Sequence, residues 1–185
     1  MIRIGILGDI GSGKSYVAKS FGYPVFNADK EVGKLYKKNK KIFSKLKKIL
    51  PKYFNSYPIK KYEVIEAILA NSNNLKKIVK IIHLEIRKEM NFFLKKNKNR
   101  KVVILDVPLL LENRINKKND ILIFVQSKKL DILKRLKRRG NFNQKLLNKF
   151  RKLQLPLDYK KRKSHFIIKN NFTNKFLKRD VKYIL

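Results

Sequence analysis

The sequence predicts an α/β fold in which a five-stranded parallel sheet carries a phosphate-binding loop. Two observations predict it: five short apolar runs alternate with helical patterns, and a glycine-rich segment directly follows the first run. Near-continuous runs of Ile, Val, Leu and Phe are typical of strands that helices cover on both faces, and their alternation with helices is typical of an open parallel sheet. The expected strands are Ile2–Leu7, Pro24–Phe26, Val102–Asp106, Ile121–Val125 and Phe166–Ile168.

The glycine-rich segment from Gly8 to Ser15 reads Gly-Asp-Ile-Gly-Ser-Gly-Lys-Ser, which matches the pattern G-x-x-x-x-G-K-[ST] between a strand and a helix. Its glycines can adopt positive φ, so that backbone N–H groups converge on an anion at the start of the helix. Lys14 would reach the terminal phosphates of a nucleotide, and the Ser15 hydroxyl would ligate Mg²⁺. The expected nucleotide-binding residues here are Asp9, Ile10, Gly11, Ser12, Gly13, Lys14, Ser15 and Tyr16.

Asp29 follows the second strand in the run Val25-Phe26-Asn27-Ala28-Asp29. Open α/β sheets bind ligands at the carboxyl ends of their strands. Asp29 is therefore a candidate to take or orient the proton of an acceptor hydroxyl. A carboxylate at the start of a helix can equally serve as its N-cap, so the residues themselves leave both roles open.

The interval between the second and third strands, residues 30–100, is far longer than a simple crossover needs. We expect helices over Lys30–Leu50, Glu63–Ala70 and Leu75–Leu94, with a turn-rich break at Tyr53–Pro58. In a phosphate-loop kinase, such an all-helical insertion is where the acceptor binds. The apolar residues of the third helix keep to one face at helical spacing, namely Leu75, Ile78, Val79, Ile82, Ile86 and Met90.

Asp106 ends the third strand, beside the strand that leads into the glycine loop, and can support the magnesium shell or orient substrate. An aspartate at a strand end can also be only a cap. A second helical segment, Asn143–Arg162, contains few acids and many bases, as expected of a lid that closes over phosphates. We therefore expect a nucleotide-binding core (residues 1–29, 101–142 and 164–185), an acceptor domain (30–100) and a lid (143–163).

The composition excludes several classes of protein. The 185 residues contain no cysteine, which excludes disulfides and thiolate metal sites. No apolar run approaches a membrane span and the N-terminus does not resemble a signal peptide, so we expect a cytoplasmic protein. The formal net charge is +35, but the lysines are spread over nearly every segment. This pattern predicts steering of anionic substrates and non-specific nucleic-acid binding at low salt, without a specific nucleic-acid partner.

These motifs resemble the dephospho-coenzyme A kinase family over almost the whole chain. The stretch from Leu105 to Glu112 is the most specific, because it nearly repeats the family signature Leu-Asp-Val-Pro-Leu-Leu-Phe-Glu. The other matching segments are the loop Gly5–Ser15, Asn27-Ala28-Asp29 for Asp-Ala-Asp, His83–Arg87 for His-Pro-x-x-Arg, Arg135 and Arg139 at the opening of the lid, Gln154-Leu155-Pro156 at its end, and Asn170 after the last strand.

The resemblance implies a P-loop kinase that transfers the γ-phosphoryl group of ATP, with Mg²⁺, to the ribose 3′-hydroxyl of dephospho-coenzyme A. It implies that Asp29 is the base, that Lys14 and Arg139 neutralise charge during transfer, and that Arg135 and Asn170 contact ATP. The implied acceptor-binding residues are Asp29, Lys61, His83, Arg87, Asp106, Pro108 and Leu109.

The chain departs from the family pattern at several positions. Asn27 replaces the first aspartate of Asp-Ala-Asp, so we infer that this position assists the chemistry. Phe150 stands where the family has a lid arginine, and Arg151 is next to it, which leaves a lid role for Arg151 open. The other departures are Leu84 after His83, Ser164-His165 before the last strand, and Lys61 for an arginine.

The two histidines have alternative roles, and the chain has two alternative functions. His83, judged by its apolar neighbours alone, fits a partly buried structural role, and His165 fits a structural role at the start of a strand. One alternative function is another small-molecule kinase, such as a nucleoside monophosphate kinase. Another is a nucleotide-dependent nucleic-acid binder. The Asp-Val-Pro-Leu-Leu stretch argues against the first, and the presence of Asp29 and Arg87 argues against the second. We expect a monomer.

Overall fold

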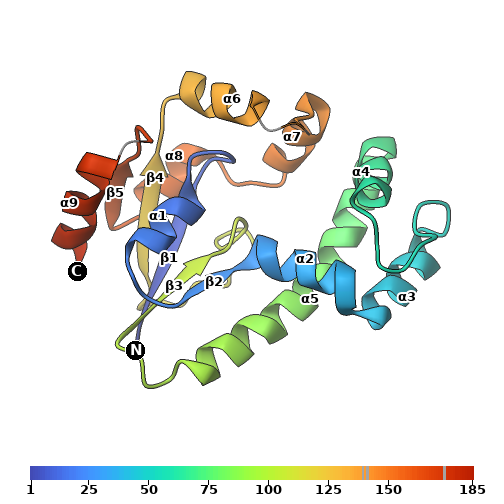
Figure 1. The fold of residues 1–185 in the computed structure, drawn as a ribbon, viewed down its shortest axis with the longest axis horizontal. Coiled ribbons are helices and arrows are strands. Elements are labelled where there is room, and N and C mark those ends of the chain that lie inside the picture. Colours follow the sequence, from blue (N-terminus) through green and yellow to red (C-terminus); the bar gives the residue numbers. More distant parts are fainter. Residues whose placement is uncertain (139, 141, 173) are drawn as a thin grey trace. The chain divides into compact units, whose positions relative to one another are not determined.

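The computed structural model describes residues 1–138, 140, 142–172 and 174–185. The chain forms two compact units (Figure 1). The first unit, residues 1–27 and 97–185, contains the sheet, and the second, residues 28–96, is helical. Across the described part of the chain, no helix combines the length and the apolar character needed to cross a bilayer.

The sheet of the first unit has five strands, all parallel, in the order β2-β3-β1-β4-β5. This confirms the predicted fold class, and each strand begins and ends within one residue of its expected position. The chain therefore encodes these strands locally, as apolar runs. Their bounds are β1 (Ile2–Gly8), β2 (Val25–Asn27), β3 (Val102–Asp106), β4 (Ile121–Gln126) and β5 (Phe166–Lys169).

Helices cover one face of this sheet with a continuous apolar core. Val17 of α1, Phe21 directly after it, and Leu177 and Val181 of α9 pack with the inward-facing residues of the strands, such as Ile104. On β1, a side chain at Gly5 would meet Leu110 and Leu122, so this glycine permits close packing. The helices of the first unit are α1 (Lys14–Ser20), α6 (Lys129–Lys137), α7 (Gln144–Arg151), α8 (Leu157–Arg162) and α9 (Asn174–Ile184).

The parallel register brings three chain segments to one edge of the sheet. Gly8, the last residue of β1, pairs with Val125 of β4, and Asn27, the last residue of β2, pairs with Asp106, the last of β3. Because all strands run the same way, the segments that follow β1, β2 and β3 leave the sheet at this edge. This is where open α/β sheets bind their ligands.

The second unit consists of α2 (Ala28–Lys38), α3 (Lys40–Ile49), α4 (Lys61–Ala70) and α5 (Ser72–Lys96). The expected single helix over Lys30–Leu50 is wrong. Asn39 is extended, and its side-chain oxygen accepts a hydrogen bond from the Ile42 N–H at 3.0 Å, so it caps a new helix. The expected apolar face of α5 is largely buried, with Val79 at its partly exposed margin.

Glu63 lies in the first turn of α4, and its buried side chain holds the preceding loop together. One carboxylate oxygen accepts from the N–H groups of Asn55 and Ser56, both at 2.9 Å, and the other accepts from the Lys60 N–H at 2.8 Å. Burial acts to raise the pKa of Glu63, but these hydrogen bonds outweigh it and hold the pKa below its usual range.

Replacing Glu63 by alanine should destabilise the protein by about 2 kcal/mol or more, because three backbone N–H groups lose a charged acceptor and a hydrogen bond to a charged group contributes about 1.5–3 kcal/mol. The measurement is the free energy of unfolding from urea denaturation. Because the folded-state pKa is lowered, the contribution of Glu63 is fully present above the usual value of 4.5 and is lost as the pH falls through the folded-state pKa.

The matched control is Glu66→Ala on the same helix, where the carboxylate is exposed. It should change the free energy of unfolding by less than about 0.5 kcal/mol. Equal losses in the two variants would contradict the anchoring role of Glu63.

Candidate active site

The segment Gly8–Ser15 forms a tight loop between β1 and α1. Gly13, the residue before α1, has φ 91°, in the left-handed region, and a side chain on it would collide with the Asn170 amide. A side chain at Gly8 would lie 2.6 Å from the Val125 carbonyl. The Lys14 Nζ donates to the carbonyls of Gly8 and Asp9, at 3.2 and 2.8 Å. The backbone of this loop can therefore approach an anion closely, and the Lys14 ammonium group lies across the loop.

Ser15, Asn27 and Asp106 meet where the loop leaves the sheet edge. The Asn27 side-chain amide donates to the Ser15 Oγ at 3.3 Å and to the buried Asp106 carboxylate. The register of β2 against β3 places Asn27 beside Asp106. Hydroxyl and carboxylate oxygens are the ligands that Mg²⁺ prefers, so the side chains of Ser15 and Asp106 fit a magnesium site.

Asn170 supports the loop from the other side. It follows β5, and its buried side chain donates to the Ser12 carbonyl at 2.9 Å. The Ser127 Oγ, after β4, donates to the same carbonyl at 2.9 Å. The sequence predicts Asn170 as a nucleotide contact, and the structure gives its side chain a definite task in holding the loop.

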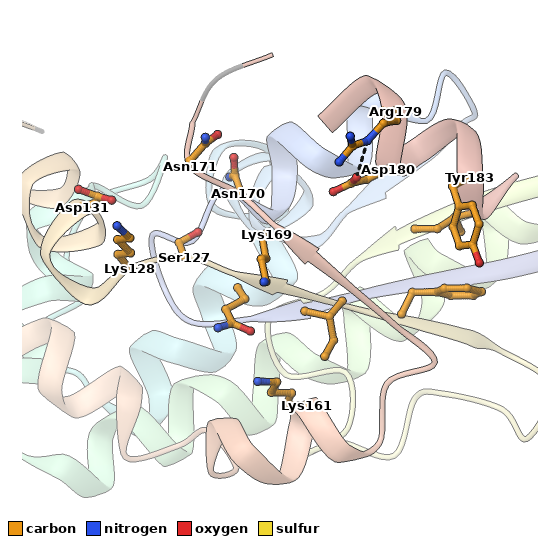
Figure 2. Close-up of a pocket in the computed structure, with 14 residues that line it drawn as sticks. Ser127, Lys128, Asp131, Lys161, Lys169, Asn170, Asn171, Arg179, Asp180 and Tyr183 are labelled. Atoms are coloured by element: carbon orange, nitrogen blue, oxygen red, sulfur yellow. Dashed lines mark ion pairs between the residues drawn. The ribbon is translucent and has the colours of Figure 1, made fainter. Parts of the chain in front are cut away.

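A pocket of about 1180 Å³ opens on this side of the loop (Figure 2). Ser127 and Asn170 line it together with Lys128, Asp131 and Asn171, and it extends along β5 toward α9. The pocket thus shares the two residues that fix the Ser12 carbonyl, while its remaining lining lies beyond the loop.

The expected lid packs on the loop through an apolar cluster. Ile132 and Leu136 of α6 and Leu147 of α7 are buried together, and Ile10 of the loop packs against them. The structure divides the expected helical segment Asn143–Arg162 into α7 and α8, with Lys152–Pro156 between them. Because Ile10 packs against this cluster, α6, α7 and the phosphate loop pack together.

Arg151, the last residue of α7, reaches the phosphate loop. Its guanidinium forms a two-point ion pair with Asp9, with Nη2–Oδ2 at 2.7 Å and Nε–Oδ1 at 3.3 Å. Asp9 is largely buried, whereas the Arg151 side chain is 41% exposed. A cationic group of the lid therefore lies at the phosphate loop, one residue after Phe150. The motif comparison points to this side chain without indicating its partner.

A buried ion pair anchors the far end of the expected lid, and no pattern in the sequence indicates it. The Lys160 Nζ of α8 contacts the Glu112 carboxylate at 2.7 Å and donates to Gln154 at 3.1 Å. The same Glu112 oxygen accepts from the Leu155 N–H at 2.9 Å. Lys160 is only 1% exposed. Because it is one of 48 lysines and arginines, nothing in the sequence distinguishes it from the exposed ones.

The other predicted nucleotide and acceptor residues of the first unit lie as follows. Arg135 of α6 stacks on the ring of Phe172, with 3.9 Å between the guanidinium carbon and the ring centre. Pro108 and Leu109, directly after β3, are half-buried, and Tyr16 of α1 is exposed. Arg139, predicted to be catalytic, lies outside the described residues.

The second unit contains the remaining predicted residues. Asp29 is exposed in the first turn of α2. Because α2 begins at Ala28, Asp29 lies inside the helix, and its alternative role as the N-cap is wrong. Lys61 begins α4 and is exposed. His83 and Arg87 lie one turn apart on α5 and so share a face.

Burial, with the nearby Arg87 charge, lowers the pKa of His83, so its ring is neutral at pH 7. The His83 Nε2 is buried and has no hydrogen-bond partner among the described residues. His165, in contrast, has a structural role. Its Nδ1 accepts from the Leu122 N–H at 3.0 Å and its own N–H donates to the Leu122 carbonyl at 2.8 Å.

Comparison with known proteins gives consistent results along the whole chain. A family model described as dephospho-CoA kinase matches residues 2–175. The dephospho-CoA kinase of Wolbachia pipientis wMel is 34% identical over 187 residues, covering 98% of this chain and 95% of its own. That of Fusobacterium nucleatum is 35% identical, covering 91% and 89%.

Solved structures share the fold. The crystal structure of TT1252 from Thermus thermophilus has a TM-score of 0.76 at 23% identity and covers 99% of this chain and 95% of its own. The dephospho-CoA kinase from Campylobacter jejuni has a TM-score of 0.64 at 22% identity, with 98% and 94% covered.

Replacing Arg151 by alanine should weaken binding of inorganic tripolyphosphate about tenfold or more, because it leaves the Asp9 carboxylate unpaired beside the bound anion. In an Asp9→Asn background the same replacement should cost several-fold less, since the repelling charge is gone. The measurement is calorimetric titration of the four chains at one ionic strength.

The matched control is Lys152→Ala, which removes the next, exposed cation. It should change affinity by no more than about twofold, as expected of a solvated charge. If Lys152→Ala and Arg151→Ala weaken binding equally, net charge and not the Asp9 pair determines the affinity.

Proposed function

This chain belongs to the dephospho-CoA kinase family, and we propose that it transfers the γ-phosphoryl group of ATP to the ribose 3′-hydroxyl of dephospho-CoA. One observation carries the proposal. The phosphate loop, with Lys14 across it, lies at the same sheet edge as the oxygen groups of Ser15 and Asp106. This edge can therefore hold both a chain of phosphates and the cation that accompanies it.

Phosphoryl transfer needs positioning and electrostatic stabilisation more than covalent chemistry from the protein. In our proposal the backbone of Gly8–Ser15 cradles the β- and γ-phosphates of ATP. The Lys14 ammonium leaves the loop carbonyls that it contacts now and pairs with phosphate oxygens. The side chains of Ser15 and Asp106 would hold Mg²⁺, which when bound neutralises charge on the phosphate oxygens. Asn27 fixes the orientation of both side chains.

The acceptor side is assigned to residues of the second unit. Asp29 would accept or orient the proton of the acceptor hydroxyl, for which an exposed carboxylate is suited. Arg87, exposed on α5, would pair with the acceptor's phosphates through its planar guanidinium. The neutral His83 beside it would contribute a hydrogen bond and no charge.

The lid would exclude water and complete the charge around the transferred group. Arg151 already lies at the loop through Asp9, and Arg139 is proposed as a second lid cation. The net charge of +35 would draw anionic substrates toward the protein and weaken in effect as salt increases.

The direct test is ATP consumption against dephospho-CoA, AMP, dTMP and shikimate in separate reactions. We expect acceptor-dependent turnover with dephospho-CoA alone. Turnover with another acceptor of the panel in its place would assign the chain to another small-molecule kinase. Selective RNA binding at physiological salt, with no acceptor-dependent turnover, would assign it to nucleic-acid binding.

Lys14→Ala should lower kcat at least about 100-fold without unfolding the protein, because it removes a charge that stabilises the transition state. Lys19→Ala, an exposed lysine on the same helix, serves as control and should retain near wild-type turnover. A Lys14→Ala chain with more than a tenth of the wild-type kcat contradicts the assignment of the phosphate loop.

Asp29→Asn should lower kcat by about 10²–10⁴-fold with little change in ATP affinity, because the amide keeps the shape but cannot accept the proton. Steady-state kinetics with saturating dephospho-CoA, together with ATP titration, separates the two effects. Near-normal turnover would make Asp29 a helix-stabilising residue and direct the search for the base to Asp106.

A further inference from the structure

Phe172 lies next to the phosphate loop in a backbone conformation that phenylalanine rarely adopts. Its φ is 66°, in the left-handed region, where a bulky side chain is strained. Its N–H donates to the Asn170 Oδ1 at 3.0 Å, and Asn170 in turn donates to the Ser12 carbonyl. Strained residues that the surroundings hold in place are concentrated at functional sites, and the mechanism above gives Phe172 no task.

The ring of Phe172 lies between the loop and helix α6. A side chain on Gly13 would come within 3.2 Å of the ring's Cε1, so the ring edge faces the loop backbone. The guanidinium of Arg135 covers the ring face at 3.9 Å. Phe172 remains half-exposed. Figure 2 shows Asn170 and Asn171, the two residues before Phe172, in the lining of the pocket. A flat apolar surface with a planar cation on it thus adjoins the site of the phosphates.

We infer that Phe172 is the base-stacking residue of the phosphoryl donor and sets a preference for purine over pyrimidine triphosphates. This inference rests on the proposed function, because it requires the triphosphate to lie in Gly8–Ser15. At 3.9 Å the guanidinium occupies the position that a base would take on the ring. The base replaces it there, and the displaced guanidinium covers the other face of the base.

The preference follows from the chemistry of the two faces. Phenyl and guanidinium groups both stack on bases without reading their hydrogen-bonding edges. Their contribution therefore grows with the area of the base, which is larger for a purine than for a pyrimidine. A residue that only fills space beside Gly13 would instead affect every ligand of the loop equally, including one without a base.

The experiment measures binding of ATP, CTP and inorganic tripolyphosphate by calorimetry, in the absence of acceptor. The chains are wild type, Phe172→Ala, Phe172→Tyr, Phe172→Gly and the control Tyr183→Ala, which removes an exposed aromatic side chain on α9. Thermal unfolding of each chain is recorded alongside. Glycine adopts the left-handed region without strain, so Phe172→Gly tests the role of the ring in a chain whose backbone is relaxed.

We expect Phe172→Ala to weaken ATP binding about 10- to 100-fold, the effect of losing one stacked base, and to leave tripolyphosphate within about twofold of wild type. Its preference for ATP over CTP should disappear. Phe172→Tyr should restore affinity and preference, and Tyr183→Ala should change neither. Phe172→Gly should lose ATP affinity as alanine does, while its unfolding midpoint stays at or above that of wild type.

Two results would overturn the inference: unchanged ATP affinity in Phe172→Ala, or equal losses for ATP and tripolyphosphate. A lower unfolding midpoint in Phe172→Gly, with weaker binding of all three ligands, would also overturn it by showing a structural role. Failure of the proposed function has a different signature, because the wild-type chain would then bind neither ATP nor tripolyphosphate.

Discussion

The carbonyl oxygen of Ser12 is the point on which the nucleotide side of this protein depends. It accepts hydrogen bonds from Asn170 after β5 and from Ser127 after β4. These two bonds fix the backbone of the phosphate loop against two strands that are distant in sequence. Gly13 has no side chain, which leaves the space that the Asn170 amide occupies. The same asparagine then positions Phe172. The shape of the loop and the aromatic surface beside it therefore have a common support.

Carboxylates are scarce in this chain, and the buried ones each hold a defined partner. The sequence has 13 acids against 48 lysines and arginines. Asp9 pairs with Arg151 and Asp106 accepts from Asn27. Glu63 holds three backbone N–H groups. Because a buried charge is costly unless it is paired or hydrogen-bonded, each of these acids constrains the segments that it joins. The excess of positive charge remains on the surface, where water and salt screen it.

The segment 143–163, the expected lid, is attached to the rest of the first unit by two polar pairs of different character. Lys160 and Glu112 are buried, so breaking their pair would leave an uncompensated charge in the interior. Asp9 is largely buried, but the Arg151 side chain is 41% exposed, so its guanidinium can exchange its partner for another anion at little cost. The pair at Lys160 is therefore the harder of the two to separate, and the pair at Arg151 the easier.

The sequence by itself determined the strands, the phosphate loop and the neighbourhood of Asp106, because each depends on local patterns. Apolar runs define buried strands, and the glycine spacing of Gly8–Ser15 defines the loop. Only the tertiary structure decided which side chains meet. Arg151 reaches Asp9 across 142 positions, Lys160 is buried on Glu112, and Arg135 covers Phe172. Such pairs depend on how helices pack on the sheet, where a shift of one residue along a helix turns the side chain by about 100°. For this reason the family motif indicates an arginine near this position, and only the packing of α7 shows that Arg151 reaches the loop.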